Sequence, residues 1–469
     1  MAILQDLVAA IGADYVLTGD ATAKWQKDWT GDYTLNPAVV VRPGSTEEVA
    51  AIIRIADAAD MAVVPVSGNT GLTGATANDG ALMLSVDRLN KMRKIDPAGR
   101  TITVEAGMIL STIHDAADDH DLIFPLTFGA RGSAMIGGAL STNAGGSNVV
   151  KYGNTRDLCL GIEVVLADGR IMNLMSELHK DNSGLDLRNL MIGAEGTLGV
   201  ITAAVLKLFP KPKAYATAMV AVPAIEDGLT LLNDIQRATG GAVEAFEYMP
   251  KPYIDRHLER AQGAKPPFDT DYDVNVMIEV AATAAKDVTP GDDGTVPIVG
   301  LLEDTLAAMF ETGRVLDAVV AQNEAQRRQM WERREAAGEI IFDPGQCVNT
   351  DIAVPLSKVG PALQSITAKL QALDPEVHEI IVSHLGDGNI HHTAYPRRND
   401  PDIMAAMVEA VEDAVQEFGG SFSAEHGVGK SKLETMRRRK DPVALDAMRA
   451  IKAALDPKGI MNPGKVIPS

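Results

Sequence analysis

Three of the nine histidines of the chain lie within nine residues, at His384, His391 and His392. The first two flank the sequence Gly-Asp-Gly-Asn, and strand-forming residues stand on both sides of it. A hairpin that turns about Asp387 would pair His384 directly with His391 on one face, close enough for two imidazoles to share a metal ion. The alternation of side chains along a strand places Thr393 on that face and turns His392 to the other.

Glu425, in the segment Ala-Glu-His-Gly-Val-Gly at 424–429, is the candidate for a third ligand. Two histidines and one carboxylate with an open position are a common catalytic arrangement for zinc, and manganese or iron(II) also accept it. A hydrogen-bonded cluster inside the core is the alternative interpretation. Residue spacing does not decide between the two.

Two glycine-rich segments earlier in the chain are typical of loops that bind an anion. The first, PVSGNTGLTG at 65–74, can turn backbone N–H groups toward a pyrophosphate, and its hydroxyl and amide side chains add donors. It matches neither the G-x-G-x-x-G nor the P-loop pattern, so a flexible surface turn is the alternative for this loop alone. The second, at 125–146, contains six glycines, and EGTLGVIT follows at 195–202.

The order and the amino-acid sequences of these three segments resemble those of the FAD-binding domain of the vanillyl-alcohol oxidase and p-cresol methylhydroxylase flavoproteins. The sequence LDPKGIMNPGK at 455–465 resembles the ending of one branch of that superfamily. This branch contains D-lactate dehydrogenases, glycolate oxidase large subunits and D-2-hydroxyglutarate dehydrogenases, and the resemblance covers nearly the whole chain. It implies an FAD-dependent enzyme that oxidises small D-2-hydroxy acids to 2-oxo acids.

The resemblance also implies which residues bind FAD. Many relatives attach the flavin through a His or Cys in or near these loops, but neither glycine-rich loop here contains either residue, and His114 lies on an expected helix. We therefore expect FAD to be bound without a covalent bond. The expected FAD contacts are Ser67, Gly68, Asn69, Thr70, Gly71, Leu72, Thr127, Ser133, Gly137, Gly138, Thr142, Asn143, Gly145, Glu195, Gly196, Ile201 and Asn462.

The segments HLGDGNIH at 384–391 and Glu-His-Gly at 425–427 are similar to the metal-binding and active-site motifs of this branch. This similarity implies that His384, His391 and Glu425 bind a divalent metal, zinc before manganese or iron. It makes His426 the catalytic base, which also contacts the substrate, and places Thr393 in the substrate pocket. The chemistry is consistent, because a divalent cation lowers the pKa of a neighbouring hydroxyl and a neutral imidazole can accept its proton.

An arginine that holds a substrate carboxylate is expected in Trp-Glu-Arg-Arg-Glu at 331–335, where Arg334 aligns with the arginine of the relatives. The guanidinium fork suits a carboxylate, although a solvated helix face is the alternative. Gly338 and Asn349 stand where hydroxyglutarate enzymes carry a Thr and a Lys for the distal carboxylate. Asn349 is expected in the pocket, and this departure argues against a strict preference for a five-carbon diacid.

Strand and helix patterns define the elements that must position these residues. Strands alternate with helices over 38–126, and a capping box at Ser45–Glu48 opens the first helix. After Pro-Lys-Pro at 210–212, the order strand, helix, strand, strand, helix, strand over 214–321 predicts a ferredoxin-like unit. A helix at 323–338, a strand at 348–354, a helix at 359–372 and the hairpin near 380–395 extend it.

Together with the resemblance, these patterns predict an α+β protein. Residues 1–35 form an N-terminal helical segment, and residues 36–212 form a two-lobed FAD-binding domain of the vanillyl-alcohol oxidase type. Residues 213–410 form a ferredoxin-like α+β substrate domain. Residues 411–469 form a C-terminal helical segment that returns to the FAD site.

Composition limits the classes of protein and partner. The formal net charge of −20 over 469 residues argues against nucleic acid as a partner. The two cysteines, Cys159 and Cys347, form no disulfide framework, and no apolar run is long enough to span a membrane. The N-terminus lacks a basic segment, so we expect a cytoplasmic protein, provided that no presequence has been removed.

Three other functions remain open at this point. A D-lactate or glycolate dehydrogenase would accept only smaller acids, a non-redox metal protein would use the His/Glu cluster alone, and a reductase of the same fold would take electrons from NADPH. The electron acceptor of a dehydrogenase also stays open among electron-transfer flavoprotein, quinone and cytochrome. A homodimer is compatible with the sequence.

Overall fold

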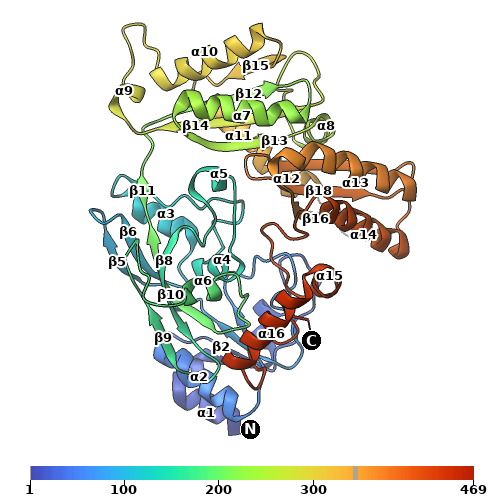
Figure 1. Ribbon diagram of the computed structural model, residues 1–469. Helices are drawn as coiled ribbons and strands as arrows, with labels where there is room; N and C mark the ends of the chain where they lie inside the picture. Colours follow the sequence, from blue (N-terminus) through green and yellow to red (C-terminus); the bar gives the residue numbers. More distant parts are fainter. Residues whose placement is uncertain (1, 342–346, 469) are drawn as a thin grey trace. The chain divides into compact units, whose positions relative to one another are not determined.

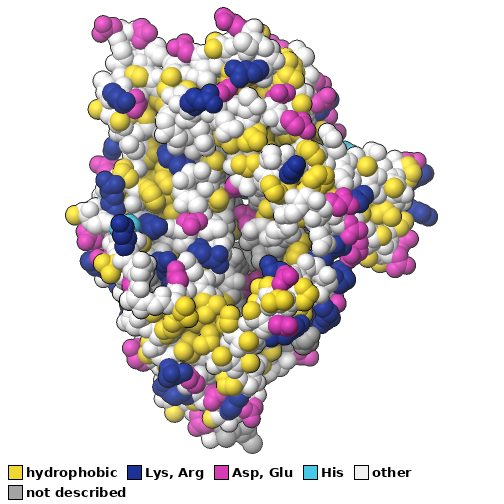
Figure 2. All heavy atoms as spheres, viewed as in Figure 1, with side chains coloured by type: hydrophobic (Ala, Val, Ile, Leu, Met, Phe, Trp, Pro, Cys, Tyr) yellow, Lys and Arg dark blue, Asp and Glu magenta, His cyan; other side chains and the backbone are white. Residues whose placement is uncertain are grey.

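The computed structural model describes residues 2–341 and 347–468, and they form two compact units. One unit contains residues 1–145, 153–210 and 425–469, and the other contains residues 146–152 and 211–424. Both combine sheets with helices, which confirms the α+β class (Figure 1). Acidic and basic side chains are mixed over the face shown in Figure 2 rather than separated by sign. Among the described residues, no helix has the length and apolar character needed to cross a lipid bilayer.

The first unit contains a small sheet with strand order β1-β2-β4-β3, in which β2, β4 and β3 run parallel. Helix α2 begins as the capping box predicts, because Ser45 accepts a hydrogen bond from the backbone N–H of Glu48 at 3.2 Å. Val49, Ile52 and Ile53 form its buried face. The elements are α1 (Ala2–Ile11), β1 (Val16–Leu17), β2 (Val39–Val41), α2 (Thr46–Ala58), β3 (Val63–Val66) and β4 (Leu82–Ser85).

A five-stranded antiparallel sheet with the order β5-β6-β10-β8-β9 belongs to the same unit. Strands β8 and β9 form the predicted hairpin at Asp168-Gly169, where Gly169 has a φ of 76°. The elements are β5 (Met92–Asp96), β6 (Thr101–Glu105), α3 (Leu110–Asp118), β7 (Leu122–Ile123), α4 (Ile136–Thr142), β8 (Cys159–Val165), β9 (Ile171–Leu174), α6 (Leu187–Met191), β10 (Val200–Lys207) and β11 (Phe209–Pro210).

The end of the chain also belongs to the first unit. After α15 (Leu433–Arg439) and α16 (Pro442–Leu455), Met461 forms a parallel bridge with Val63 of β3. The backbone N–H of Asn462 donates to the carbonyl of Val63, and that of Val63 donates to the carbonyl of Ile460, each at 2.8 Å. The C-terminal segment therefore lies beside the strand that leads into the first glycine-rich loop.

The second unit is built on a seven-stranded antiparallel sheet with the order β15-β12-β14-β13-β17-β18-β16. Its first part, β15-β12-β14-β13, has the strand order of the predicted ferredoxin-like unit. The strands are β12 (Ala214–Ala221), β13 (Val243–Tyr248), β14 (Asn275–Ala282), β15 (Asp317–Val320), β16 (Val348–Ala353), β17 (His378–His384) and β18 (Asn389–Tyr395). The helices are α5 (Val149–Tyr152), α7 (Ile225–Thr239), α8 (Lys251–Arg260), α9 (Ala285–Val288), α10 (Pro297–Glu311), α11 (Glu324–Glu335), α12 (Ala337–Ile341), α13 (Val359–Leu373) and α14 (Pro401–Glu417).

The two faces of this sheet pack differently. Side chains of α7, α10, α13 and α14 bury one face in a large apolar core, which includes Phe246, Ile278 and Ile390. The other face packs in part against α8, α11 and α12, around Met277 and Val382. The polar candidates on β13, β17, β18 and β16 lie on this second face, because they alternate with the residues of the large core.

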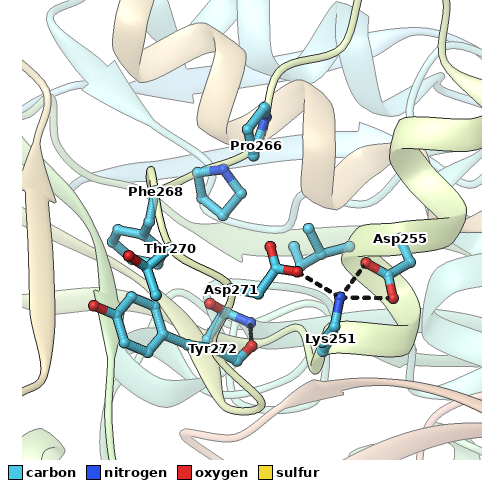
Figure 3. Close-up of a pocket in the computed structure, with 10 residues that line it drawn as sticks. Lys251, Asp255, Pro266, Phe268, Thr270, Asp271 and Tyr272 are labelled. Atoms are coloured by element: carbon cyan, nitrogen blue, oxygen red, sulfur yellow. Dashed lines mark hydrogen bonds and ion pairs between the residues drawn. The ribbon is translucent and has the colours of Figure 1, made fainter.

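Helix α8 lies in a stretch that the sequence pattern did not identify as a helix, although Pro252 in its first turn is a typical start signal. Lys251 pairs with Asp255 at 2.8 Å and with Asp271 at 3.0 Å, which ties the helix to the loop that follows it (Figure 3). Phe268 packs edge-on against Tyr272 in that loop. The helix matters for the site because Tyr253 donates a hydrogen bond to the carbonyl of Arg333 at 2.6 Å.

Candidate functional site

His384 and His391 lie on the same face of the β17–β18 hairpin, as predicted, but the predicted register is wrong. His384 pairs with Asn389, and His391 pairs with Val382. The two histidines are therefore diagonal neighbours, with ring centroids 5.4 Å apart and planes at 78°. The turn spans four residues, because the N–H groups of Asp387 and Gly388 both donate to the carbonyl of His384 at 3.1 Å.

His392 points to the opposite face, as the alternation predicted. Its side chain is fully buried, and Nε2 lies 2.8 Å from a carboxylate oxygen of Glu379. Thr393 returns to the face of His391, is buried, and pairs across the ladder with Asn349 of β16. The structure therefore brings Thr393 and Asn349 together with the two candidate metal ligands.

Asp351 is a candidate ligand that sequence reasoning missed. It pairs with His391 across the β16–β18 ladder, and its Oδ1 lies 3.8 Å from the Nδ1 of His391. It is buried, and it accepts a hydrogen bond from the side-chain amide of Asn389 at 2.9 Å. The only signal in the sequence is an acidic residue two positions after Asn349 in a strand, which is weak without knowledge of the partner strand.

Arg334 and His384 both contact the carboxylate of Glu247. Glu247 on β13 is fully buried and pairs across the ladder with His384. One of its oxygens lies 2.8 Å from His384 Nδ1, and the other accepts a hydrogen bond from Arg334 Nε at 2.5 Å. Burial raises the pKa of Glu247, but the charges of His384 and Arg334 outweigh this effect and hold the pKa below its usual value. Arg334 is therefore buried and ion-paired, which contradicts the solvated-face alternative.

Glu425 and His426 belong to the first unit. The side-chain hydroxyl of Thr73, in the first glycine-rich loop, donates to the carbonyl of His426 at 3.3 Å. His426 Nε2 lies 3.6 Å from Glu425 Oε1. Glu425 directly follows Ala424, whose N–H donates to a carboxylate oxygen of Asp351 at 3.2 Å.

The two glycine-rich loops meet in the first unit. A Cβ on Gly68 would lie 2.4 Å from the carbonyl oxygen of Ser133, and one on Gly137 would lie 2.7 Å from the Cβ of Ala106. The N–H of Gly138 donates to the hydroxyl of Ser67 at 3.2 Å. These close approaches explain why glycine is needed where the second loop packs against the first loop and against Ala106.

Other glycines in these loops leave open space. A Cβ on Gly71, Gly129 or Gly132 would meet no other atom within 4 Å. The loops thus combine tight contact at one place with room at another, and they carry many backbone N–H groups. This arrangement fits a bound dinucleotide whose phosphates the loops would contact.

Asn462 and Glu195 connect the C-terminal segment to this region. The Asn462 side-chain amide donates to the carbonyls of Glu195 at 2.7 Å and Ala75 at 3.1 Å. The carboxylate of Glu195 accepts hydrogen bonds from the N–H groups of Val428 and Gly429 at 2.7 and 2.9 Å. Burial raises the pKa of Glu195, although these two donors oppose the shift.

The remaining expected FAD contacts lie in the same unit. Asn69, Asn143 and Glu195 have positive φ angles, as expected for loops with unusual turns. Ile201 is buried within β10, so its side chain belongs to the core. His114 lies on α3, with Nε2 3.0 Å from the carbonyl of Leu126. The other contacts lie in the first loop (Thr70, Leu72), the second loop (Thr127, Thr142, Gly145) and beside Pro65 (Gly196).

Two family models match consecutive parts of the chain. One, described as an FAD binding domain, matches residues 37–175. The other, described as the C-terminal domain of FAD linked oxidases, matches residues 211–466. The second model therefore covers the seven-stranded sheet of the second unit and most of the C-terminal segment of the first.

Curated relatives match over almost the full chain. D-2-hydroxyglutarate dehydrogenase from Xanthomonas citri pv. viticola is 37% identical, over 94% of this chain and 91% of its own length. The protein of that name from Stutzerimonas stutzeri is 34% identical, over 99% and 98%. The mitochondrial D-2-hydroxyglutarate dehydrogenase of Danio rerio is 33% identical, over 94% and 80%.

Solved structures give the fold. p-Cresol methylhydroxylase with substrate bound aligns with a TM-score of 0.74 at 17% identity, over 99% of this chain and 96% of its own. Alkyldihydroxyacetonephosphate synthase aligns with a TM-score of 0.72 at 16% identity, over 99% and 86%. The resemblance read from the glycine-rich segments is thereby confirmed, and the chain belongs to the FAD-linked oxidase family, with the fold of the vanillyl-alcohol oxidase and p-cresol methylhydroxylase flavoproteins.

Proposed function

We propose that this chain oxidises D-2-hydroxy acids to 2-oxo acids, with non-covalently bound FAD as the hydride acceptor and a divalent metal beside the substrate. The observation that carries the proposal is a group of polar side chains on one face of the sheet in the second unit. There two histidines lie with ring centroids 5.4 Å apart, one of them sharing a carboxylate with a buried arginine. The relatives that match nearly the whole chain are named D-2-hydroxyglutarate dehydrogenase.

The metal is assigned to His384, His391 and Glu425, zinc before manganese or iron. Two imidazoles and a carboxylate fit such a cation, and Asp351 offers a further oxygen near His391. When bound, a divalent cation would lower the pKa of a substrate hydroxyl beside it. FAD, held by the glycine-rich loops, would accept the hydride from C2.

The protein side chains then have separate roles. Arg334 binds a substrate carboxylate, because a guanidinium presents several N–H groups and can hold Glu247 and a substrate at once. His426 accepts the hydroxyl proton on its imidazole. Thr393 and Asn349 line the pocket from β18 and β16.

The substrate range is proposed to include D-malate and D-lactate as well as D-2-hydroxyglutarate. The resemblance implies that Gly338 and Asn349 stand where hydroxyglutarate enzymes carry two anchors for the distal carboxylate, and this departure favours smaller acids as the second candidate. The domain limits at 35, 212 and 410, a cytoplasmic location and a homodimer are further parts of the proposal. The acceptor of the flavin electrons is an electron-transfer flavoprotein, a quinone or a cytochrome.

Anaerobic flavin reduction by a panel of D- and L-2-hydroxy acids tests the activity. We expect the visible flavin absorbance to bleach with D-2-hydroxy acids and to persist with their L-isomers. A flavin that NADPH reduces and D-2-hydroxy acids do not would identify a reductase instead. A purified protein that binds metal but no flavin would identify a non-redox metal protein.

A further inference from the structure

Glu247 has a position that none of the assigned roles explains. Its carboxylate is fully buried, at the boundary between an apolar cluster and the polar face of the sheet. Burying a carboxylate costs several kcal/mol unless partners compensate it, and an apolar pair would stabilise the fold as well or better. The residue therefore calls for an explanation in the geometry of its two partners.

The first partner is His384. An imidazole that binds a metal is neutral and carries one N–H, and the contact of 2.8 Å between Nδ1 and the carboxylate, which can only accept, places that proton on Nδ1. The lone pair is then on Nε2. Histidines that bind metals usually donate their second ring N–H to a carboxylate or carbonyl in this way, which fixes the tautomer and the ring orientation.

The second partner is Arg334. Its Nε donates to the other oxygen of Glu247 at 2.5 Å, so one carboxylate sets the orientation of an imidazole and of a guanidinium. Arg334 Nη2 also lies 3.4 Å from His384 Nδ1 and 3.3 Å from Nε2, so the guanidinium lies against the imidazole ring, beside the nitrogen assigned to the cation. A displacement of Glu247 would disturb both.

From this geometry we infer that Glu247 is a positioning residue: it sets the tautomer of His384 for a divalent cation and orients Arg334 toward a substrate carboxylate. The inference rests on the proposed function, because it takes His384 as a metal ligand and Arg334 as the carboxylate anchor. It adds a residue to which no role in the reaction has been given.

Glu279 provides a matched control within the same unit. It lies on β14, next to β13, and is also buried. It accepts hydrogen bonds from Arg327 Nε at 2.7 Å and Nη2 at 2.8 Å, and Arg327 lies two turns before Arg334 on α11. Its other partners are Trp331 and Thr217, at 2.8 and 2.6 Å. The two glutamates thus make the same kind of buried ion pair with one helix, but only Glu247 contacts a histidine.

The test compares Glu247→Gln and Glu279→Gln in the FAD-loaded protein, with zinc affinity measured by competition with a chromophoric chelator. We expect Glu247→Gln to weaken zinc binding by about ten- to a hundred-fold, as for other carboxylates behind a metal-binding histidine. Glu279→Gln should leave zinc affinity unchanged while it lowers the melting temperature. Flavin content and melting temperature of both variants show that they are folded.

A second readout separates positioning from general damage. At saturating zinc, Glu247→Gln should raise the KM for D-2-hydroxy acids more than it lowers kcat, because Arg334 has lost its charged partner. Equal zinc affinity in Glu247→Gln and wild type, with weakened binding in His384→Ala, would overturn the inference and leave the proposed metal site intact. Equal loss in Glu247→Gln and Glu279→Gln would also overturn it. If the wild type bound no zinc, or if His384→Ala bound zinc as tightly as the wild type, the proposed metal site would fail as well.

Discussion

At the scale of single residues, the sequence resemblance predicts that hydroxyglutarate enzymes carry a Thr and a Lys where this chain has Gly338 and Asn349. Gly338 lies in α12, and a Cβ there would meet no other atom within 4 Å, so a larger side chain fits. Asn349 is exposed on β16, opposite Thr393. Both positions can therefore accept the Thr and Lys of those relatives without disturbing the core.

We predict that the double variant Gly338→Thr, Asn349→Lys gains activity on D-2-hydroxyglutarate. A new charge-assisted contact to the distal carboxylate contributes about 1.5–3 kcal/mol, or roughly ten- to a hundred-fold in kcat/KM. The measurement is the ratio of kcat/KM for D-2-hydroxyglutarate and D-lactate in the variant and the wild type. D-Lactate, which has no distal carboxylate, is the internal control. An unchanged ratio would mean that the two side chains do not reach the substrate.

Glu247 and Asp351 show why part of the site could not be predicted from the sequence. Each is an isolated acidic residue in a strand. Its role in the site depends on the histidine opposite it, which is His384 for Glu247 and His391 for Asp351. Strand alternation gives the face of a side chain, but only the tertiary structure gives its partner. By contrast, the histidine spacing and the glycine-rich loops are local signals, and they were sufficient to find the region.

At the scale of elements, the β17–β18 hairpin shows what periodicity fixes and what it leaves open. The face of each histidine was predicted correctly, because it depends only on alternation. The register was wrong, because the turn contains four residues and packs against distant segments. A Cβ on Gly386 would lie 2.8 Å from Val150, and Gly388 has a φ of 84°. Such contacts are absent from the local sequence pattern.

The strand order of the ferredoxin-like part was predictable because that motif has one common topology.

Adjacent histidines on β18 allow a test of this alternation. His391→Ala should abolish or strongly weaken zinc binding and turnover, since the residue faces His384 and Asp351. His392→Ala should leave zinc affinity unchanged but destabilise the fold by about 1–3 kcal/mol, since Glu379 loses a buried hydrogen-bond partner. Zinc titration and thermal unfolding of both variants provide the measurement. Equal loss of zinc affinity in the two variants would contradict the observed face assignment.

The meeting of the two glycine-rich loops makes a further prediction. Gly68→Ala places a Cβ 2.4 Å from the carbonyl oxygen of Ser133, so the loops must separate. We expect the purified variant to contain little FAD and to melt at a lower temperature. Gly300→Ala, the same change in helix α10 of the other unit, is the control and should retain full flavin content. A Gly68→Ala protein with stoichiometric FAD would show that this close approach is not required for cofactor binding.

At the scale of the whole molecule, the candidate cofactor residues divide between the two units. The glycine-rich loops, Glu195 and Asn462 belong to the first unit, and His384 and His391 belong to the second. The two glycine-rich loops are held together by their own contacts, such as the hydrogen bond from the N–H of Gly138 to the hydroxyl of Ser67. This hydrogen bond involves none of the three assigned metal ligands, so we expect that the flavin and the metal can be removed one at a time.

We therefore predict that a chelator lowers turnover of D-2-hydroxy acids while the flavin stays bound, and that added zinc or manganese restores the rate. Acid precipitation should then release all the yellow colour into the supernatant, since the loops at 65–74 and 125–146 contain no His or Cys for a covalent link. Absorbance of the supernatant and metal analysis of the chelated protein provide the two measurements. Loss of flavin together with metal would show that the two sites depend on each other. Flavin retained in the acid pellet would show a covalent bond to a residue outside these loops.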